Sequence, residues 1–107
     1  MSTDPKTVYK AVVDELQATS PAVPGKNFGM PALKIGSKVF AGFAGDGMVF
    51  KLPDSARAEA LALPGAHLFD PAGMSRPMKE WVVVPADHAA RWPDLARVAL
   101  HYVESTR

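Results

Sequence analysis

The chain has 107 residues, of which 48% are hydrophobic and 21% are charged, and its formal net charge is +1. This length suits a single domain spanning residues 1–107, and the composition is that of a folded globular protein rather than a disordered chain. The absence of cysteine excludes disulfides, zinc–thiolate sites and thiol nucleophiles, and the net charge is lower than that of a dedicated nucleic-acid-binding domain.

The first segment predicts a helix over residues 5–18. Thr3 or Asp4 can cap its first turn through a side-chain oxygen, and Pro5 has the fixed φ that suits the first helical position. Apolar side chains then recur at helical spacing, at Val8, Val12, Val13 and Leu16, with Tyr9 beside them. A turn-rich connection is predicted over residues 21–29.

Residues 30–52 predict a three-stranded antiparallel meander. Leu33 and Ile35 alternate with their neighbours at the two-residue period of a strand. The Gly36-Ser37 pair fits a hairpin turn, because glycine tolerates a positive φ there. The Gly-Asp-Gly sequence at 45–47 predicts the second turn.

A short helix over 55–63 is predicted next, and Pro64-Gly65 ends it. An extended piece at 66–69 and a loop at 70–77 precede a strand at 78–84, whose tryptophan and three valines have the shapes that suit a buried strand.

The last helix is predicted to start at Pro93. We expect its buried stripe to comprise Leu95, Val98, Ala99, Tyr102 and Val103, and its opposite face to carry Asp94, Arg97, His101 and Glu104. This order of elements has no βαβ repeat. It predicts an α+β fold, in which an antiparallel sheet made of the meander plus a later strand packs against N- and C-terminal helices.

Two features of the sequence predict a cytoplasmic location. The first twenty residues contain acids and no continuous apolar segment, which excludes a signal peptide. The longest apolar stretch, around 81–86, is far shorter than the roughly 20 residues of a membrane-spanning helix. We therefore expect no membrane partner.

Two segments resemble known families. The run GKNFGMPALKIGSKVFAGFAGDGMVFKLP resembles the MmcQ/YjbR family of small bacterial proteins, in which a Gly-Met-Pro segment opens a strand and a lysine-bearing hairpin follows. The run FDPAGMSRPMKEWVVVP is similar to that family and to the N-terminal domain of the TfoX competence regulators, with Ser75 and Glu80 where their motif has glycines. The residues that match the motif are Arg76, Pro77, Met78, Lys79 and Trp81.

This resemblance implies a compact α+β domain with an antiparallel sheet against helices. For the MmcQ/YjbR group it further implies a double-wing type of DNA-binding architecture, and for the TfoX group a regulatory setting. It implies no catalytic residue at any position of this chain, and no cofactor is predicted.

Arg76 and Lys79 are candidate anion ligands at the start of the strand, because guanidinium offers a rigid fork for phosphate and lysine adds a point charge. The alternative is that Arg76 pairs with Asp70 or Glu80 and holds the loop in place.

A second cationic set consists of Lys26, Lys34, Lys38 and Lys51, in a stretch where Asp46 is the only acid. These lysines are candidate ligands of DNA phosphates. Alternation predicts that Lys34 and Lys51 share an exposed face. The alternative is a solvated sheet in which lysines prevent strand addition.

No catalytic constellation is recognisable, because His67, His88 and His101 lack metal-site spacing and no serine has a base in a known signature. The sequence therefore favours a noncatalytic binding or regulatory module, with DNA or another protein as its partner. The alternative is a small-molecule binder or cryptic enzyme that uses an apolar pocket near Arg76 and Trp81.

Overall fold

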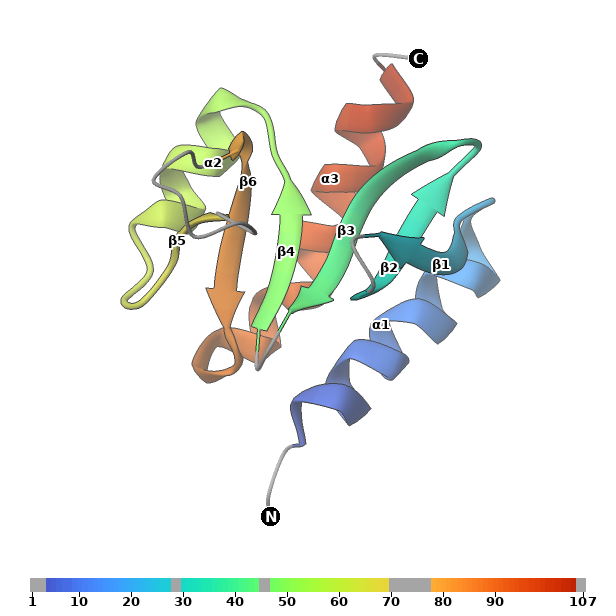
Figure 1. Ribbon diagram of the computed structural model, residues 1–107, viewed down its shortest axis with the longest axis horizontal. Coiled ribbons are helices and arrows are strands. Elements are labelled where there is room, and N and C mark those ends of the chain that lie inside the picture. Colours follow the sequence, from blue (N-terminus) through green and yellow to red (C-terminus); the bar gives the residue numbers. More distant parts are fainter. Residues whose placement is uncertain (1–3, 28–29, 45–46, 70–77, 106–107) are drawn as a thin grey trace.

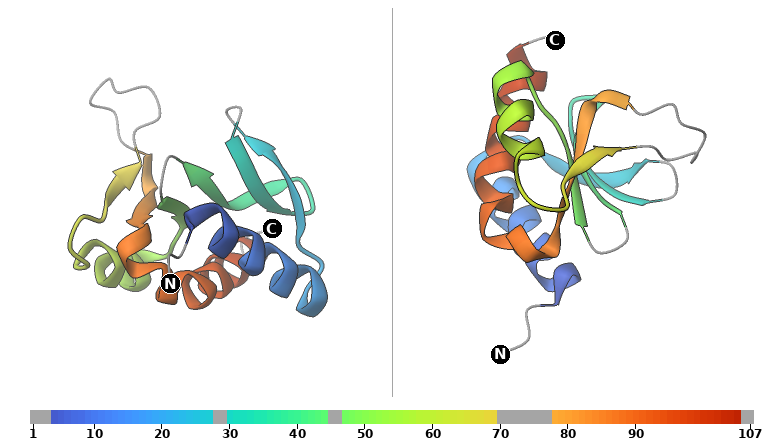
Figure 2. Two further views of the ribbon diagram at one scale, coloured as in Figure 1. Left: turned by 90° about the horizontal axis from the view of Figure 1, so that it is seen from below. Right: turned by 90° about the vertical axis from the view of Figure 1, so that its left-hand side faces the viewer.

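Helices cover one face of a six-stranded antiparallel sheet in the computed structural model, which describes residues 4–27, 30–44, 47–69 and 78–105 (Figures 1 and 2). The strand order is β1-β2-β3-β4-β6-β5. The elements in chain order are α1 (Pro5–Thr19), β1 (Val23–Asn27), β2 (Met30–Ile35), β3 (Lys38–Ala44), β4 (Gly47–Lys51), α2 (Asp54–Leu61), β5 (His67–Phe69), β6 (Met78–Pro85), the 3₁₀ helix η1 (Ala86–Arg91) and α3 (Trp92–Ser105).

The α+β fold predicted from the sequence is confirmed, with its meander at β2, β3 and β4 and the later strand β6 beside β4. The first hairpin turn also lies where it was predicted. Ile35 pairs with Lys38 across it, and Gly36 has a φ of 61°. Glycine is favoured at this position, because a side chain strains the backbone at positive φ.

The prediction of an irregular connection at 21–29 was wrong, because β1 forms there and pairs with β2 from Val23↔Lys34 to Asn27↔Met30. Proline is tolerated at Pro24, since a strand at the edge of a sheet needs its N–H groups on one side only. Local composition favours a turn, and pairing with β2 overrides it.

The first two helices begin and end for local reasons. Asp4 caps α1 by accepting from the backbone N–H of Lys6 at 3.3 Å, as the sequence predicted. Helix α2 ends at Leu61, two residues before its predicted end. Pro64 disfavours a helical conformation at Leu63, the residue before it, so the helix cannot extend to its predicted end.

The predicted buried stripe of α3 was partly wrong. The buried residues are Trp92, Ala96, Ala99, Leu100 and Val103, whereas Leu95 and Tyr102 are half-buried and Val98 is 37% exposed. The observed stripe keeps Ala99 and Val103 of the prediction and is rotated toward Trp92, Ala96 and Leu100. Side-chain size alone does not reveal which stripe faces the sheet.

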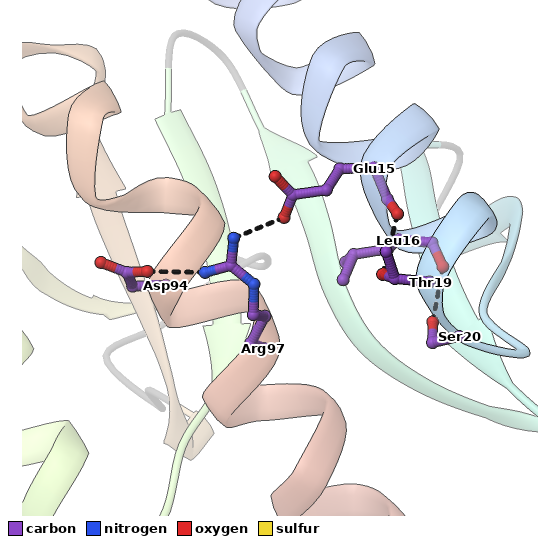
Figure 3. Close-up of polar contacts among 6 residues, drawn as sticks. All are labelled: Glu15, Leu16, Thr19, Ser20, Asp94 and Arg97. Atoms are coloured by element: carbon purple, nitrogen blue, oxygen red, sulfur yellow. Dashed lines mark hydrogen bonds and ion pairs between the residues drawn. The ribbon is translucent and has the colours of Figure 1, made fainter.

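Two contacts fix α3 in the helical layer. The Trp92 indole is fully buried, donates from Nε1 to the Val84 carbonyl at 3.2 Å, and lies edge-on to Phe43 with ring centroids 6.4 Å apart. At the surface, the Arg97 guanidinium bridges Glu15 of α1 and Asp94 at 2.7 and 2.6 Å (Figure 3). None of the described helices has the length and apolar character needed to cross a membrane.

Candidate functional site

The face of the sheet opposite the helices, called here the outer face, has an apolar floor. Cross-strand pairing places Ala32, Gly42, Val49 and Val83 side by side on it. Ala32 and Val49 are each only 2% exposed, although the helices lie on the other side of the sheet (Figure 2). Trp81 is half-buried and pairs with Lys51 on the same face.

The four lysines of the second cationic set do not share one face. The pairings Lys34↔Val39 and Lys51↔Trp81 place two of them on the outer face, as alternation predicted. Lys26 pairs with Pro31 and therefore lies on the face toward α1, and Lys38 pairs with Ile35, whose side chain is in the core. The lysines are thus distributed over both sides of the sheet.

Lys51 belongs to a polar network that joins three elements. Its Nζ lies 3.6 Å from Oε2 of Glu80 on β6, and Oε1 of Glu80 accepts a hydrogen bond from the Tyr102 hydroxyl of α3 at 2.6 Å. The Tyr102 hydrogen bond and the Lys51 charge lower the pKa of Glu80, and the same hydrogen bond raises the pKa of Tyr102. Lys51 is therefore partly neutralised within the fold.

The other three lysines lie on one three-stranded unit, called here the basic wing, made of β1, β2 and β3. Residues 23–44 contain Lys26, Lys34 and Lys38 and no acidic residue. The ion pairs formed by the described residues include none of these three ammonium groups. In Figure 2 the hairpin of β1 and β2 rises away from the helical layer.

The predictions for Arg76 fall outside the described residues, as does the loop at 70–77 that holds it. Lys79 lies in β6, but its side chain is also outside the described part. Glu80, one partner considered for Arg76, contacts Tyr102 and Lys51.

A groove that the sequence did not predict lies between α1 and the hairpin of β1 and β2. Its volume is about 320 Å³, and it is lined by Lys6, Tyr9, Lys10, Val13, Pro24, Gly25, Pro31, Ala32 and Phe43. Tyr9 is only 9% exposed and its hydroxyl has no hydrogen-bond partner among the described residues. Burial raises the pKa of Tyr9 to about 12, so the hydroxyl keeps its proton at neutral pH.

The sequence does not predict this groove, because its second wall is β1, where the sequence predicts a turn-rich connection. The stripe of Lys6, Tyr9, Lys10 and Val13 follows helical spacing and was visible in the sequence. In a sequence that does not predict β1, such a stripe indicates only the edge of a helix that packs on the core.

Two histidines contact backbone carbonyls, and one of them, His67, pairs with Val83 and so lies at the edge of the outer face. Nδ1 of His67 lies 3.1 Å from the Gly65 carbonyl, and Nε2 of His88 lies 2.9 Å from the Pro64 carbonyl. Within the described ranges, no group of three or more His, Cys, Asp or Glu is placed to hold a metal ion.

No family model, curated protein or solved structure matches this chain. Any functional assignment therefore depends on the fold and on the side chains described above.

Proposed function

We propose that this protein is a noncatalytic binding module whose basic wing contacts the phosphate backbone of DNA. The observation that carries the proposal is the charge of the wing, which has three lysines without ion pairs among the described residues and no acid between positions 23 and 44. A local cluster of this kind attracts phosphates even where the net charge of the whole chain is only +1.

The position of the lysines on both faces of the wing favours a hairpin that lies along a groove of the duplex. Lys34 is on the outer face and Lys26 is on the face toward α1, so the two ammonium groups can contact opposite phosphate chains. Lysine binds phosphate as a point charge and carries no base-specific geometry. The proposed binding is therefore independent of DNA sequence and steeply dependent on salt.

The experiment measures the affinity for a short duplex by fluorescence anisotropy between low and physiological salt. If the three lysines neutralise about three phosphates, the slope of log K against log salt should be about −3. Each of the variants Lys26→Gln, Lys34→Gln and Lys38→Gln should reduce the magnitude of the slope by about one.

Lys51→Gln is the matched control. Lys51 is already paired with Glu80, so this substitution should leave the slope nearly unchanged. Failure to bind the duplex at low salt would end the proposal. An equal change of the slope in all four variants would also contradict the proposal, because Lys51 would then contribute to DNA binding as much as the lysines of the wing.

A second candidate function is the binding of a small apolar molecule on the outer face beside Trp81. The observation that favours it is Trp81 itself, a half-buried aromatic side chain that pairs with Lys51 on this face. In an NMR screen of aromatic fragments, a ligand at this face should shift the indole N–H resonance of Trp81. The Trp92 resonance, whose N–H is bonded to Val84 in the core, is the internal control. Fragments that leave Trp81 unshifted would exclude this face.

A further inference from the structure

The edge strand β1 has an unusual composition for a strand, because Pro24 and Gly25 stand next to each other in it. Proline on an edge strand hinders pairing with a strand of another molecule. An edge protected in this way remains open to a partner that is not a strand. Gly25 needs a separate explanation, because its φ is not positive and other residues can adopt its backbone conformation.

Gly25 leaves room for the side chain of Lys34. A Cβ at Gly25 would lie 3.1 Å from Cε, 3.4 Å from Cδ and 3.7 Å from Nζ of Lys34, the nearest heavy atoms outside residues 24–26. Lys34 pairs with Val23, so its side chain reaches the diagonal neighbour along β1. Lys34 is accordingly half-buried, whereas Lys26 and Lys38 are exposed. Its stem therefore lies across β1.

This arrangement brings two cations to the same strand. β1 is the outermost strand, in the hairpin that rises away from the helical layer (Figure 2). The stem of Lys34 carries its ammonium from β2 toward β1, which are about 4.8 Å apart. Lys26 follows Gly25 directly in β1, with its side chain on the opposite face. A duplex whose groove receives this edge therefore meets one ammonium group on each side of β1.

We propose that Gly25 is a positioning residue of the basic wing, which lets Lys34 lie across β1 so that Lys34 and Lys26 contact phosphates from either side of this strand. The inference rests on the proposed binding of DNA and names β1 as the strand that enters the groove. A lysine held against a strand loses less side-chain freedom on meeting a phosphate than a freely rotating one. Gly25 carries no charge and acts only through Lys34.

The test is a double-mutant cycle on the full chain, with the affinity for the short duplex measured by fluorescence anisotropy at about 50 mM salt. Gly25→Val should weaken binding by about three- to tenfold although it removes no charge, because the valine occupies the path of the Lys34 stem. In the Lys34→Gln background, the same substitution should change the affinity by less than about 1.5-fold. In the Lys38→Gln background it should keep its full effect, because Lys38 lies on β3.

A second measurement tests the position of Lys34 without DNA. In the free protein, the Gly25 Hα protons should give nuclear Overhauser effects to the Lys34 Hε protons. Valine is favoured in strands, so Gly25→Val should fold. Gly25→Ala displaces the stem less and should give a smaller loss of affinity, and it serves as the test if the valine disturbs β1.

The outcomes separate this inference from the proposed function. Failure of the wild type to bind the duplex would overturn both. If the wild type binds, an unchanged affinity in the folded Gly25 variants would overturn the role of Gly25 alone. The same holds if Gly25→Val weakens binding equally with and without the Lys34 ammonium, or if the nuclear Overhauser effects between Gly25 and Lys34 are absent.

Discussion

Glu80 shows how one side chain can couple the stability of this fold to pH. Its carboxylate accepts a hydrogen bond from the Tyr102 hydroxyl at 2.6 Å and lies 3.6 Å from the Lys51 ammonium. Both contacts lower the pKa of Glu80. A carboxyl group whose pKa is lowered by folding stabilises the folded state at pH values above its unfolded pKa. That stabilisation is lost as the pH falls through the folded pKa.

Glu80→Gln should therefore lower the free energy of unfolding at pH 7 and have a smaller effect at pH 3, below the ordinary glutamate pKa of about 4.3. The loss at pH 7 should be less than about 1 kcal/mol, because the side chain is 43% exposed and solvent screens its partners. Urea unfolding at the two pH values measures both quantities. Glu59→Gln, at an exposed position of α2, is the control. An equal effect of Glu80→Gln at both pH values would contradict the assignment.

At the scale of the elements, α1 and α3 are joined at the surface by Arg97. The guanidinium contacts Glu15 of α1 at 2.7 Å and Asp94 of its own helix at 2.6 Å (Figure 3). Arg97→Ala removes both contacts and should lower the free energy of unfolding by about 0.5–1 kcal/mol in low salt, the range of exposed ion pairs. Denaturant unfolding in low salt and in concentrated sodium chloride checks this.

The difference between wild type and Arg97→Ala should shrink in concentrated salt, which screens exposed charges. Arg91→Ala, an exposed arginine outside the ion pairs of the described residues, should have a smaller effect at either salt concentration. If Arg97→Ala lowers the free energy of unfolding equally at both salt concentrations, Arg97 contributes through packing and not through its ion pairs.

The elements also show where local patterns predict structure and where they do not. Alternation around Leu33 and Ile35 predicted the meander, because one face of those strands is in the core and the other is not. The strand β1 was not predictable, because its proline and glycine favour a turn and only its pairing with β2 makes it a strand. The buried stripe of α3 was not predictable, because it depends on packing against elements distant in the sequence. The groove beside Tyr9 was missed for the same reason, because it exists only once β1 is placed beside β2 and α1.

For the whole molecule, the distribution of charge depends on strand pairing rather than on sequence spacing. Lys26 and Lys34 are separated onto opposite faces by the register of β1 with β2. Lys51 contacts Glu80 because β6 pairs directly with β4, although α2 and β5 separate the two strands in the sequence. The composition of the cationic set was visible in the sequence. The strand order is needed to see that Lys51 is paired with Glu80 whereas the other three lysines lie on the basic wing.

The pairing of β4 with β6 holds the two halves of the sheet together, and at Gly47 it leaves little room for a side chain. A Cβ at Gly47 would lie 2.8 Å from the Val84 carbonyl oxygen, a backbone atom that cannot move without shifting β6. Gly47→Ala should therefore lower the free energy of unfolding by about 1–3 kcal/mol, the usual effect of overpacking.

Gly25→Ala is the matched control for this junction. Its Cβ would meet Lys34 Cε at 3.1 Å, on a flexible side chain that can turn aside, so the change should stay within about 0.5 kcal/mol. Equilibrium unfolding in urea compares the two variants. Equal stability of Gly47→Ala and Gly25→Ala would mean that β6 can shift away from β4 at little cost, and the rigid junction inferred from their backbone contact would then be wrong.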